Sequence, residues 1–212
     1  LSLSNYPRAL ESLFSALTYF EKASKETGSN KLGIRNGIAN CYLNIANVFG
    51  KQKEYGKELE YYQKAFDAYE SFKYKPGMAL VIGNMGDVFM RKKEYDSAIH
   101  YVNRSLSLYS AMKDSIGIER NYSNLGSIYL SKGDYRLALV NTSIAIDIAK
   151  RKKYFASSGY SKQIMGEIYM GLAKDTARLA SVQAGFTQVQ AMDLAMNYID
   201  SSIRTFRQAD DQ

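Results

Sequence analysis

The stretch Asn-Ile-Ala-Asn-Val-Phe, at residues 44–49, recurs in variant form along this chain. Asn-Met-Gly-Asp-Val-Phe lies at residues 84–89, Asn-Leu-Gly-Ser-Ile-Tyr at 124–129 and Ile-Met-Gly-Glu-Ile-Tyr at 164–169. Each copy begins 40 residues after the previous one. A period of this length marks tandem supersecondary units, each of which stacks on its neighbours to bury its apolar face. We therefore expect an array of units, with a functional surface that is extended rather than confined to one cleft.

Within one repeat, two amphipathic runs follow each other. Residues 80–90 carry apolar side chains at helical spacing, and residues 95–109 carry a second stripe of the same kind. The charged residues at 92–94 separate the two runs, and a Gly-containing segment at 114–117 closes the unit. The pattern predicts a hairpin of two helices, so the whole chain is expected to be all-α.

Small and aromatic residues also recur at the 40-residue step. A small residue at each of four equivalent positions would let two helices approach closely, because a larger side chain would push the backbones apart. An aromatic residue opens the second helix of three repeats. The small residues are Ala46, Gly86, Gly126 and Gly166, and the aromatic residues are Tyr55, Tyr95 and Tyr135.

No linker divides the chain, so we expect one continuous array over residues 1–212. Residues 5–19 match the pattern of a second helix that lacks its first, and a long connection should run from Phe20 to Gly37. The last hairpin should contain an insertion near residues 174–190, with Gly185 as a turn. The expected parts are a truncated repeat with its connection at 1–36, full repeats at 37–76, 77–116 and 117–156, and an extended hairpin at 157–212.

The composition excludes several classes of protein. Hydrophobic residues make up 46% of the 212 residues and charged residues 23%, which is ordinary for a folded chain. No apolar run is long enough to span a membrane. The single histidine, His100, and the single cysteine, Cys41, cannot build a His or Cys metal cluster. We find no phosphate-binding loop and no catalytic constellation, so we expect no cofactor, no metal and no enzymatic activity.

The net charge of +7 raises a second function class, contact with nucleic acid or an anionic membrane. Most basic clusters, such as residues 91–93 and 150–153, fall where a helix should end. Cations there complement the negative end of the helix dipole. The clusters also lack the interleaved aromatic residues on which bases stack, so we do not expect nucleic acid as the partner.

The spacing of small, aromatic and alanine residues resembles the tetratricopeptide repeat over nearly the whole chain. Glu58 departs from it, since the family favours alanine there, and we expect a looser helix contact at that point. The resemblance is clearest at Gly86, Phe89, Tyr95, Ala98 and Ser105, and at Gly126, Tyr129, Tyr135, Ala138 and Ala145.

The 40-residue step, with asparagine two residues before the glycine, is similar to the longer variant of this repeat. That variant occurs in kinesin light chains, Pins/LGN scaffolds and bacterial signalling proteins. The resemblance implies antiparallel hairpins in a right-handed superhelical solenoid, with the first helices lining a concave groove.

Counting from the small residues, the groove side should carry a polar set on four first helices. The ligand-binding candidates are Asn40, Asn44, Asn47, Asn84, Asp87, Arg91, Arg120, Asn124, Ser127 and Gln163. The same side should also carry Leu43, Leu80, Gly83, Ser123, Tyr160 and Glu167.

The asparagines at 44, 84 and 124 are central to this set. A carboxamide can pair with both the N–H and the C=O of a peptide group, so a row of them could hold an extended peptide. In the longer variant, the resemblance implies such a role. The alternative is that these amides bond across the helix pair or to water. A carboxylate clamp of the Hsp90-binding type is a further alternative, but Leu43 replaces its first lysine and Asp87 would repel a carboxylate.

We therefore expect a protein- or peptide-binding module. The Tyr- and Asn-rich repeats resemble those that precede histidine kinase or nucleotide cyclase domains in bacteria of the Bacteroidetes type. That resemblance implies the sensory or scaffolding region of a larger signalling protein. The uncovered helix faces of a truncated first hairpin could also pair with a second copy of the chain.

Overall fold

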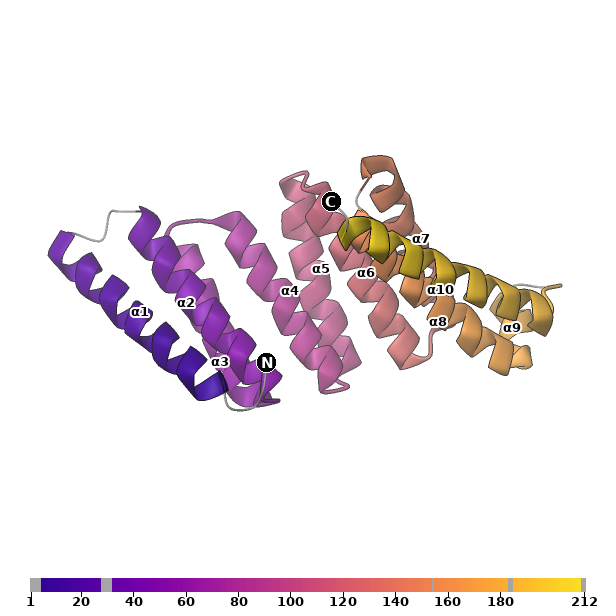
Figure 1. The fold of residues 1–212 in the computed structure, drawn as a ribbon, viewed down its shortest axis with the longest axis horizontal. Helices are drawn as coiled ribbons and strands as arrows, with labels where there is room; N and C mark the ends of the chain where they lie inside the picture. The colour runs from indigo at the N-terminus through magenta and orange to yellow at the C-terminus, as the bar shows by residue number, and fades with distance from the viewer. Residues whose placement is uncertain (1–4, 28–31, 154, 183–184, 211–212) are drawn as a thin grey trace. The chain divides into compact units, whose positions relative to one another are not determined.

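The computed structural model describes residues 5–27, 32–153, 155–182 and 185–210 (Figure 1). Within these residues the chain consists of helices and turns, without strands, which confirms the all-α prediction. The helices are α1 (Tyr6–Thr27), α2 (Leu32–Lys51), α3 (Tyr55–Ser71), α4 (Lys75–Arg91), α5 (Tyr95–Ala111), α6 (Ser115–Lys132), α7 (Tyr135–Lys152), α8 (Phe155–Lys174), α9 (Thr176–Val182) and α10 (Gln188–Asp210).

The chain divides into two compact units. The N-terminal unit, residues 1–108, holds α1 to α4 and most of α5. The C-terminal unit, residues 109–212, holds the last turn of α5 and α6 to α10. Each unit has its own hydrophobic core, so each is described by itself.

In the N-terminal unit, α2 packs between α1 and α3, and α3 also packs on α4. Close approach of α4 and α5 depends on Gly86, because a Cβ there would lie 2.7 Å from Cγ2 of Val102. The Ser105 hydroxyl on α5 donates to the Ala79 carbonyl at 2.8 Å, which adds a polar link between the two helices. The predicted role of a small residue is confirmed at this position. The central core consists of Ala39, Ala46, Tyr62, Ala65, Tyr69, Val81, Met85 and Val88.

In the C-terminal unit, α8 packs against α6, α7, α9 and α10. The short helix α9 lies in the stretch where an insertion was expected, and it contacts the turn between α6 and α7. Arg178 on α9 donates from Nη1 to the Gly133 carbonyl at 3.4 Å and lies over the ring of Tyr135. The insertion therefore adds a covering helix to this unit. The core consists of Ala138, Ile164, Met165, Ile168, Leu172, Ala173, Leu179 and Ala191.

The first two helices are longer than expected. The connection expected from Phe20 to Gly37 is helical at both ends, since α1 runs to Thr27 and α2 begins at Leu32. Residues 20–27 contain Glu, Lys and Ala and no Gly or Pro, so nothing in them stops a helix. In the last hairpin, α8 has 20 residues and α10 has 23, against 17 or 18 for α3 to α7.

The turns share one backbone feature, a residue in the left-handed conformation every 20 positions. Gly133 has φ of 83°, and the other five such residues are lysines with φ from 57° to 63°. The left-handed residue after a helix lets its N–H and the next one satisfy the last carbonyls. At Lys93, for example, its N–H donates to the Met90 carbonyl and that of Glu94 to the Phe89 carbonyl. The five lysines are Lys53, Lys73, Lys93, Lys113 and Lys153.

Candidate functional site

In the N-terminal unit, the predicted binding residues stand on α2 and α4, which both pack on α3. The residues on α2 are Asn40, Asn44 and Asn47, and those on α4 are Asn84, Asp87 and Arg91. Asn40, Asn44 and Asp87 are exposed, whereas Asn47, Asn84 and Arg91 are half-buried. All six therefore keep some access to solvent.

The buried Tyr62 on α3 connects asparagines of the two first helices. Its hydroxyl donates to Oδ1 of Asn47 at 2.6 Å, and the side chain of Asn84 hydrogen-bonds to the same hydroxyl. Burial raises the pKa of Tyr62 well above its usual range, and the nearby charge of Glu58 raises it further. Tyr62 therefore stays neutral and fixes the orientation of both amides.

The other asparagines of α2 differ in their bonding. Oδ1 of Asn40 accepts a 2.6 Å hydrogen bond from the hydroxyl of the buried Tyr69. Asn44 is exposed, and its amide has no hydrogen-bond partner within the described residues. Asn44 thus leaves both a donor and an acceptor available to a ligand.

Arg91, near the C-terminal end of α4, forms the centre of a charged cluster. Its Nη2 donates to Oε1 of Glu58 at 2.6 Å, and its Nε donates to Oδ2 of Asp87 at 2.9 Å. The guanidinium also lies 5.1 Å from the ring centroid of Tyr55. Glu58 is 2% exposed and the Arg91 side chain 29%, so this ion pair, which joins α3 to α4, is buried on the side of the glutamate.

Opposing effects set the proton affinities in this cluster. Burial raises the pKa of Glu58, although its hydrogen bond and ion pair with Arg91 lower it in part. Burial alone would lower the pKa of Arg91, but the hydrogen bond to Glu58 and the charge of Asp87 raise it above its usual range. Loss of Arg91 would leave the carboxylate of Glu58 buried without an opposite charge, which would destabilise the folded state.

In the C-terminal unit, the predicted residues stand on α6 and α8. Arg120 and Gln163 are exposed, and Asn124 and Ser127 are half-buried. Nε2 of Gln163 donates to Oε1 of Glu167 one turn later, at 3.0 Å. Asn124 has no hydrogen-bond partner in the described part of the chain, so it resembles Asn44 rather than Asn84.

Ser123, expected on the groove side, is instead buried in a polar cluster. It is 2% exposed, and its Oγ lies 2.6 Å from Oγ of Ser161 on α8. Both hydroxyls donate to Oε1 of Glu119, at 3.1 Å from Ser123 and 2.9 Å from Ser161. Residues four apart share one face of a helix, so Ser123 lies on the same buried face as Glu119 and can donate to it.

Two family models for the tetratricopeptide repeat match this chain, one over residues 77–150 and the other over residues 39–72. The two matched segments contain Ala46, Gly86 and Gly126, the small residues of three of the four repeats. The chain belongs to the tetratricopeptide repeat family. Among curated proteins, no sequence matches it.

Solved tetratricopeptide-like structures share the fold. BtubC (BKLC) from P. vanneervenii is 13% identical with a TM-score of 0.64, covering 97% of this chain and 92% of that one. The apo form of RapI is 17% identical with a TM-score of 0.59, covering 95% and 79%. A putative kinesin light chain from Podosopora anserina, with nearly identical TPR-like repeats, is 10% identical with a TM-score of 0.60, covering 96% and 94%. At such identities the likeness shows the fold alone.

Glu58 is the main departure from the tetratricopeptide pattern, and the expected loose contact around it is wrong. Space for the side chain comes from Gly50 on α2, where an added Cβ would lie 2.6 Å from Cδ of Glu58. The residues equivalent to Gly50 in the later repeats are Met90, Leu130 and Met170, and those equivalent to Glu58 include Ala98 and Ala138. The combination of a small residue at 50 and a large one at 58, the reverse of the next repeats, could therefore have predicted this close contact from the sequence.

Three further observations concern metal ligands, membrane-spanning helices and the one thiol of this tetratricopeptide chain. The described residues contain no group of three or more metal-ligating side chains. None of the described helices is long and apolar enough to cross a membrane. Cys41 is buried, and burial raises the pKa of its thiol, which disfavours the reactive thiolate.

Proposed function

We propose that the surface formed by α2 and α4 binds an extended peptide segment of a partner protein. Tetratricopeptide repeats serve as protein-interaction modules, and this chain carries their repeats over both units. The choice of the α2 and α4 surface as the peptide site rests on the asparagine amides of these first helices. Asn124 on α6 offers the same group in the C-terminal unit.

One observation carries the proposal: Asn44 is exposed and has no hydrogen-bond partner in the described part of the chain, while Asn84 is held in place by Tyr62. If the amide of Asn84 donates to Tyr62, its Oδ1 still faces a ligand as an acceptor. A fixed amide loses less side-chain entropy when it binds, and a free amide can meet both polar groups of a peptide unit. Asn84 would therefore provide a contact of fixed orientation, and Asn44 would provide one that can adjust to the peptide.

A peptide selected from a displayed random library against the wild-type chain provides the probe. We expect the Asn44→Ala/Asn84→Ala double variant to weaken its binding by about tenfold or more, since two hydrogen bonds to the peptide are lost. Asn124→Ala, measured separately, reports whether the C-terminal unit takes part. Fluorescence anisotropy of the labelled peptide gives the dissociation constants.

Asn103 on α5 and Asn197 on α10 are exposed asparagines on second helices, so their alanine variants serve as controls. They should bind the peptide as the wild type does. Equal affinity of the Asn44→Ala/Asn84→Ala variant and the controls would reject the proposal, provided that circular dichroism shows an intact helical fold.

We infer that the module is the sensory or scaffolding region of a larger signalling protein, such as a histidine kinase or nucleotide cyclase. The support is the resemblance of its Tyr- and Asn-rich repeats to those of such proteins. Sequencing the complete reading frame tests this inference. A catalytic output domain in the same frame is expected, and a frame without one would contradict it.

A further inference from the structure

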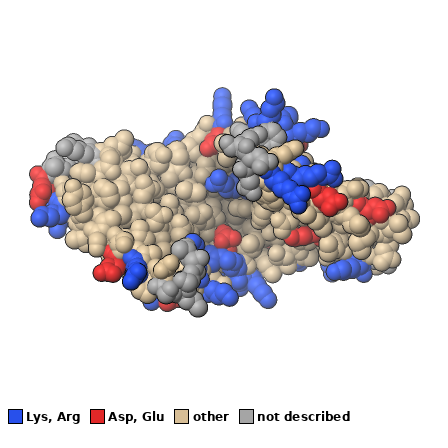
Figure 2. Space-filling model, viewed as in Figure 1, with Lys and Arg blue, Asp and Glu red and all other residues tan. Residues whose placement is uncertain are grey.

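Basic side chains gather around the end of α7 in the C-terminal unit. Figure 2 shows Lys and Arg clustered over the C-terminal ends of α7 and α10. Three of the lysines, Lys150, Lys153 and Lys162, line one cavity of about 380 Å³. This volume lies in the range of small-molecule sites. The other lining residues are Ile146, Ala149, Ser158, Thr205 and Gln208.

The three lysines are the charged residues in the described lining of this cavity. Within the described residues, none of its three lysines pairs with a carboxylate. The last two turns of α7 contain one acidic residue, Asp147, and Arg151 already binds its carboxylate. Elsewhere in the chain, exposed lysines have glutamate partners in the pairs Lys57–Glu54, Lys64–Glu60 and Lys92–Glu94, while others such as Lys93 and Lys174 have none within the described residues.

Lys162 is the most constrained of the three lysines. It is half-buried on α8, and its Nζ donates to Oγ1 of Thr205 on α10 at 2.8 Å. That hydroxyl in turn donates to the Ser201 carbonyl at 2.7 Å, so it serves the lysine only as an acceptor. Burial lowers the pKa of Lys162, because lost hydration of the ammonium is not offset by a negative charge. An anion in the cavity would supply that charge.

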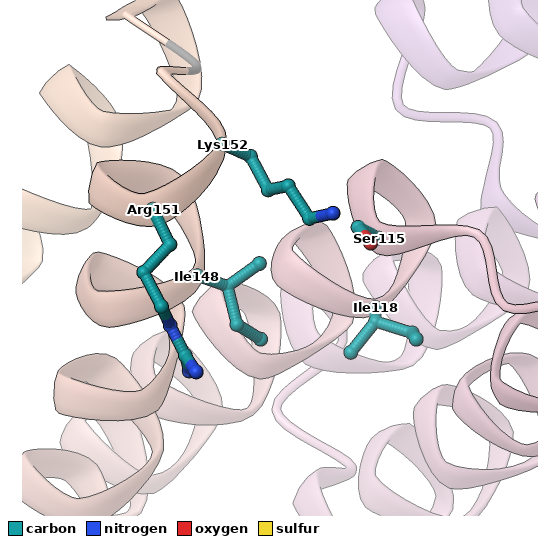
Figure 3. A pocket seen from close by; sticks show the side chains of 5 residues that line it. All are labelled: Ser115, Ile118, Ile148, Arg151 and Lys152. Carbon is teal, nitrogen blue, oxygen red and sulfur yellow. The ribbon is translucent and has the colours of Figure 1, made fainter.

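A second cavity on the other side of α7 provides a contrast. It has a volume of about 450 Å³ and is lined by Ser115 and Ile118 of α6 and by Ile148, Arg151 and Lys152 of α7. Figure 3 shows the two isoleucines facing each other and Lys152 directed toward Ser115, while Arg151 points away.

Most charged groups in or near this second cavity already have partners. Arg151 is paired with Asp147, and the Asp114 side chain already accepts from the N–H groups of Ile116 and Gly117 at the start of α6. Of the two basic residues in its described lining, Lys152 is the one that lacks a charged partner. The cavity whose three lysines lack a carboxylate partner among the described residues is therefore the better anion site.

We propose that the cavity of Lys150, Lys153 and Lys162 binds a phosphate group, either free or carried by a small organic molecule. Lysine ammonium groups act as point charges toward phosphate, and three of them match its several oxygens. Ser158 and Gln208 add neutral hydrogen-bonding groups, while Ile146 and Ala149 offer an apolar wall to an organic substituent. The described lining has no aromatic ring for a base to stack on, which disfavours single-stranded nucleic acid.

Isothermal titration calorimetry with three probes tests the proposal. Phenyl phosphate carries both the charge and an apolar body, inorganic phosphate carries the charge alone, and phenol carries the body alone. We expect saturable binding of phenyl phosphate and no binding of phenol. Weaker binding of inorganic phosphate would identify an organic phosphate as the ligand, and equal binding would identify free phosphate.

Lys162→Gln should weaken phenyl phosphate binding by about tenfold or more, the factor implied by one lost charge-assisted hydrogen bond. Because Lys162 is half-buried, the exposed pair Lys150→Gln/Lys153→Gln is a second variant that leaves the interior intact, and it should have an effect of at least that size. Lys174, exposed at the end of α8 and absent from the cavity lining, is the matched control as Lys174→Gln.

Three results would overturn the proposal. These are no saturable binding of phenyl phosphate to the wild type, equal binding by the wild type and both cavity variants, and binding of phenol as tight as that of phenyl phosphate. Tight binding of a DNA oligonucleotide without binding of phenyl phosphate would instead indicate a polyanion surface.

Discussion

Each unit of the molecule buries one glutamate, and the two carboxylates are satisfied in different ways. Glu58 in the N-terminal unit is 2% exposed and pairs with the guanidinium of Arg91. Glu119 in the C-terminal unit is fully buried and accepts from the hydroxyls of Ser123 and Ser161. In both residues the second oxygen, Oε2, has no hydrogen-bond partner within the described residues. One unit thus surrounds a buried carboxyl group with an arginine, and the other surrounds it with neutral hydroxyl donors.

Both glutamates occupy positions at which other repeats have alanine. Ala98 and Ala138 are equivalent to Glu58, and Ala39 and Ala79 are equivalent to Glu119. A repeat fold therefore accepts a carboxylate at a packed position if neighbouring residues change with it. These neighbours, rather than the position itself, therefore determine what burial of a carboxyl group costs.

The largest expected effect comes from breaking the pair at Arg91. Arg91→Met keeps much of the side-chain stem but leaves Glu58 buried without its cation, which should cost about 3–5 kcal/mol of unfolding free energy. Urea denaturation followed by circular dichroism measures the change. Arg104, exposed on α5 over the ring of Tyr101, is the control, and Arg104→Met should change stability by less than about 1 kcal/mol. A similar small change for Arg91→Met would show that the pair contributes little.

A double-mutant cycle between positions 50 and 58 sharpens the comparison. Gly50→Met alone forces a side chain into the space of Glu58, and Glu58→Ala alone leaves a cavity beside Gly50. Together the two changes recreate the Met90 and Ala98 arrangement of the next repeat. We expect the double variant to be more stable than either single variant, with a coupling energy of about 1–3 kcal/mol. Additive effects would show that the two positions do not compensate each other.

The C-terminal unit can be tested at Ser161. Ser161→Ala removes one of the two hydroxyls that donate to Glu119, and we expect a loss of about 1–2 kcal/mol because the buried carboxylate loses a donor. Ser143, an exposed serine on α7, provides the control as Ser143→Ala. Denaturation in urea compares the two variants. If Ser161→Ala cost as much as Arg91→Met, neutral donors and an arginine would be equivalent partners.

The smallest effect is a pH dependence that belongs to Glu58. Burial raises its pKa above the ordinary value of 4.5, so the folded protein binds this proton more tightly than the unfolded chain. The resulting stabilisation is present below pH 4.5 and is lost as pH rises through the folded pKa. The unfolding free energy of the wild type, relative to that of Glu58→Gln, should therefore decrease as pH rises through that window. Urea denaturation of both proteins over a pH series measures it, and an increase would contradict the assignment.

The sequence predicted what depends on periodicity. Tyr55, Tyr95 and Tyr135 were expected to open second helices, and they are the first residues of α3, α5 and α7. The close contact at Gly86 was likewise expected, since a recurring small residue reports close packing.

The pairing of polar side chains could not be predicted in the same way. Ser123 lies at a position that periodicity assigns to the groove, yet it is buried on the same helix face as Glu119, one turn earlier, and donates to it. Asn84 repeats Asn44 and Asn124 in sequence, but Tyr62 replaces the Val102 and Thr142 of later repeats and so binds Asn84. Periodicity shows which residues share a face, whereas hydrogen-bond partners come from other helices and differ between repeats.

The left-handed lysines of the turns have a practical consequence. All five are exposed, and each follows a helix that a protease cannot enter without unwinding it. Trypsin cleaves after lysine, so brief digestion should cut between helices and give fragments that differ by multiples of about 20 residues. The order in which those fragments accumulate would show which hairpin opens first, and the chain thus carries its own set of markers for local unfolding.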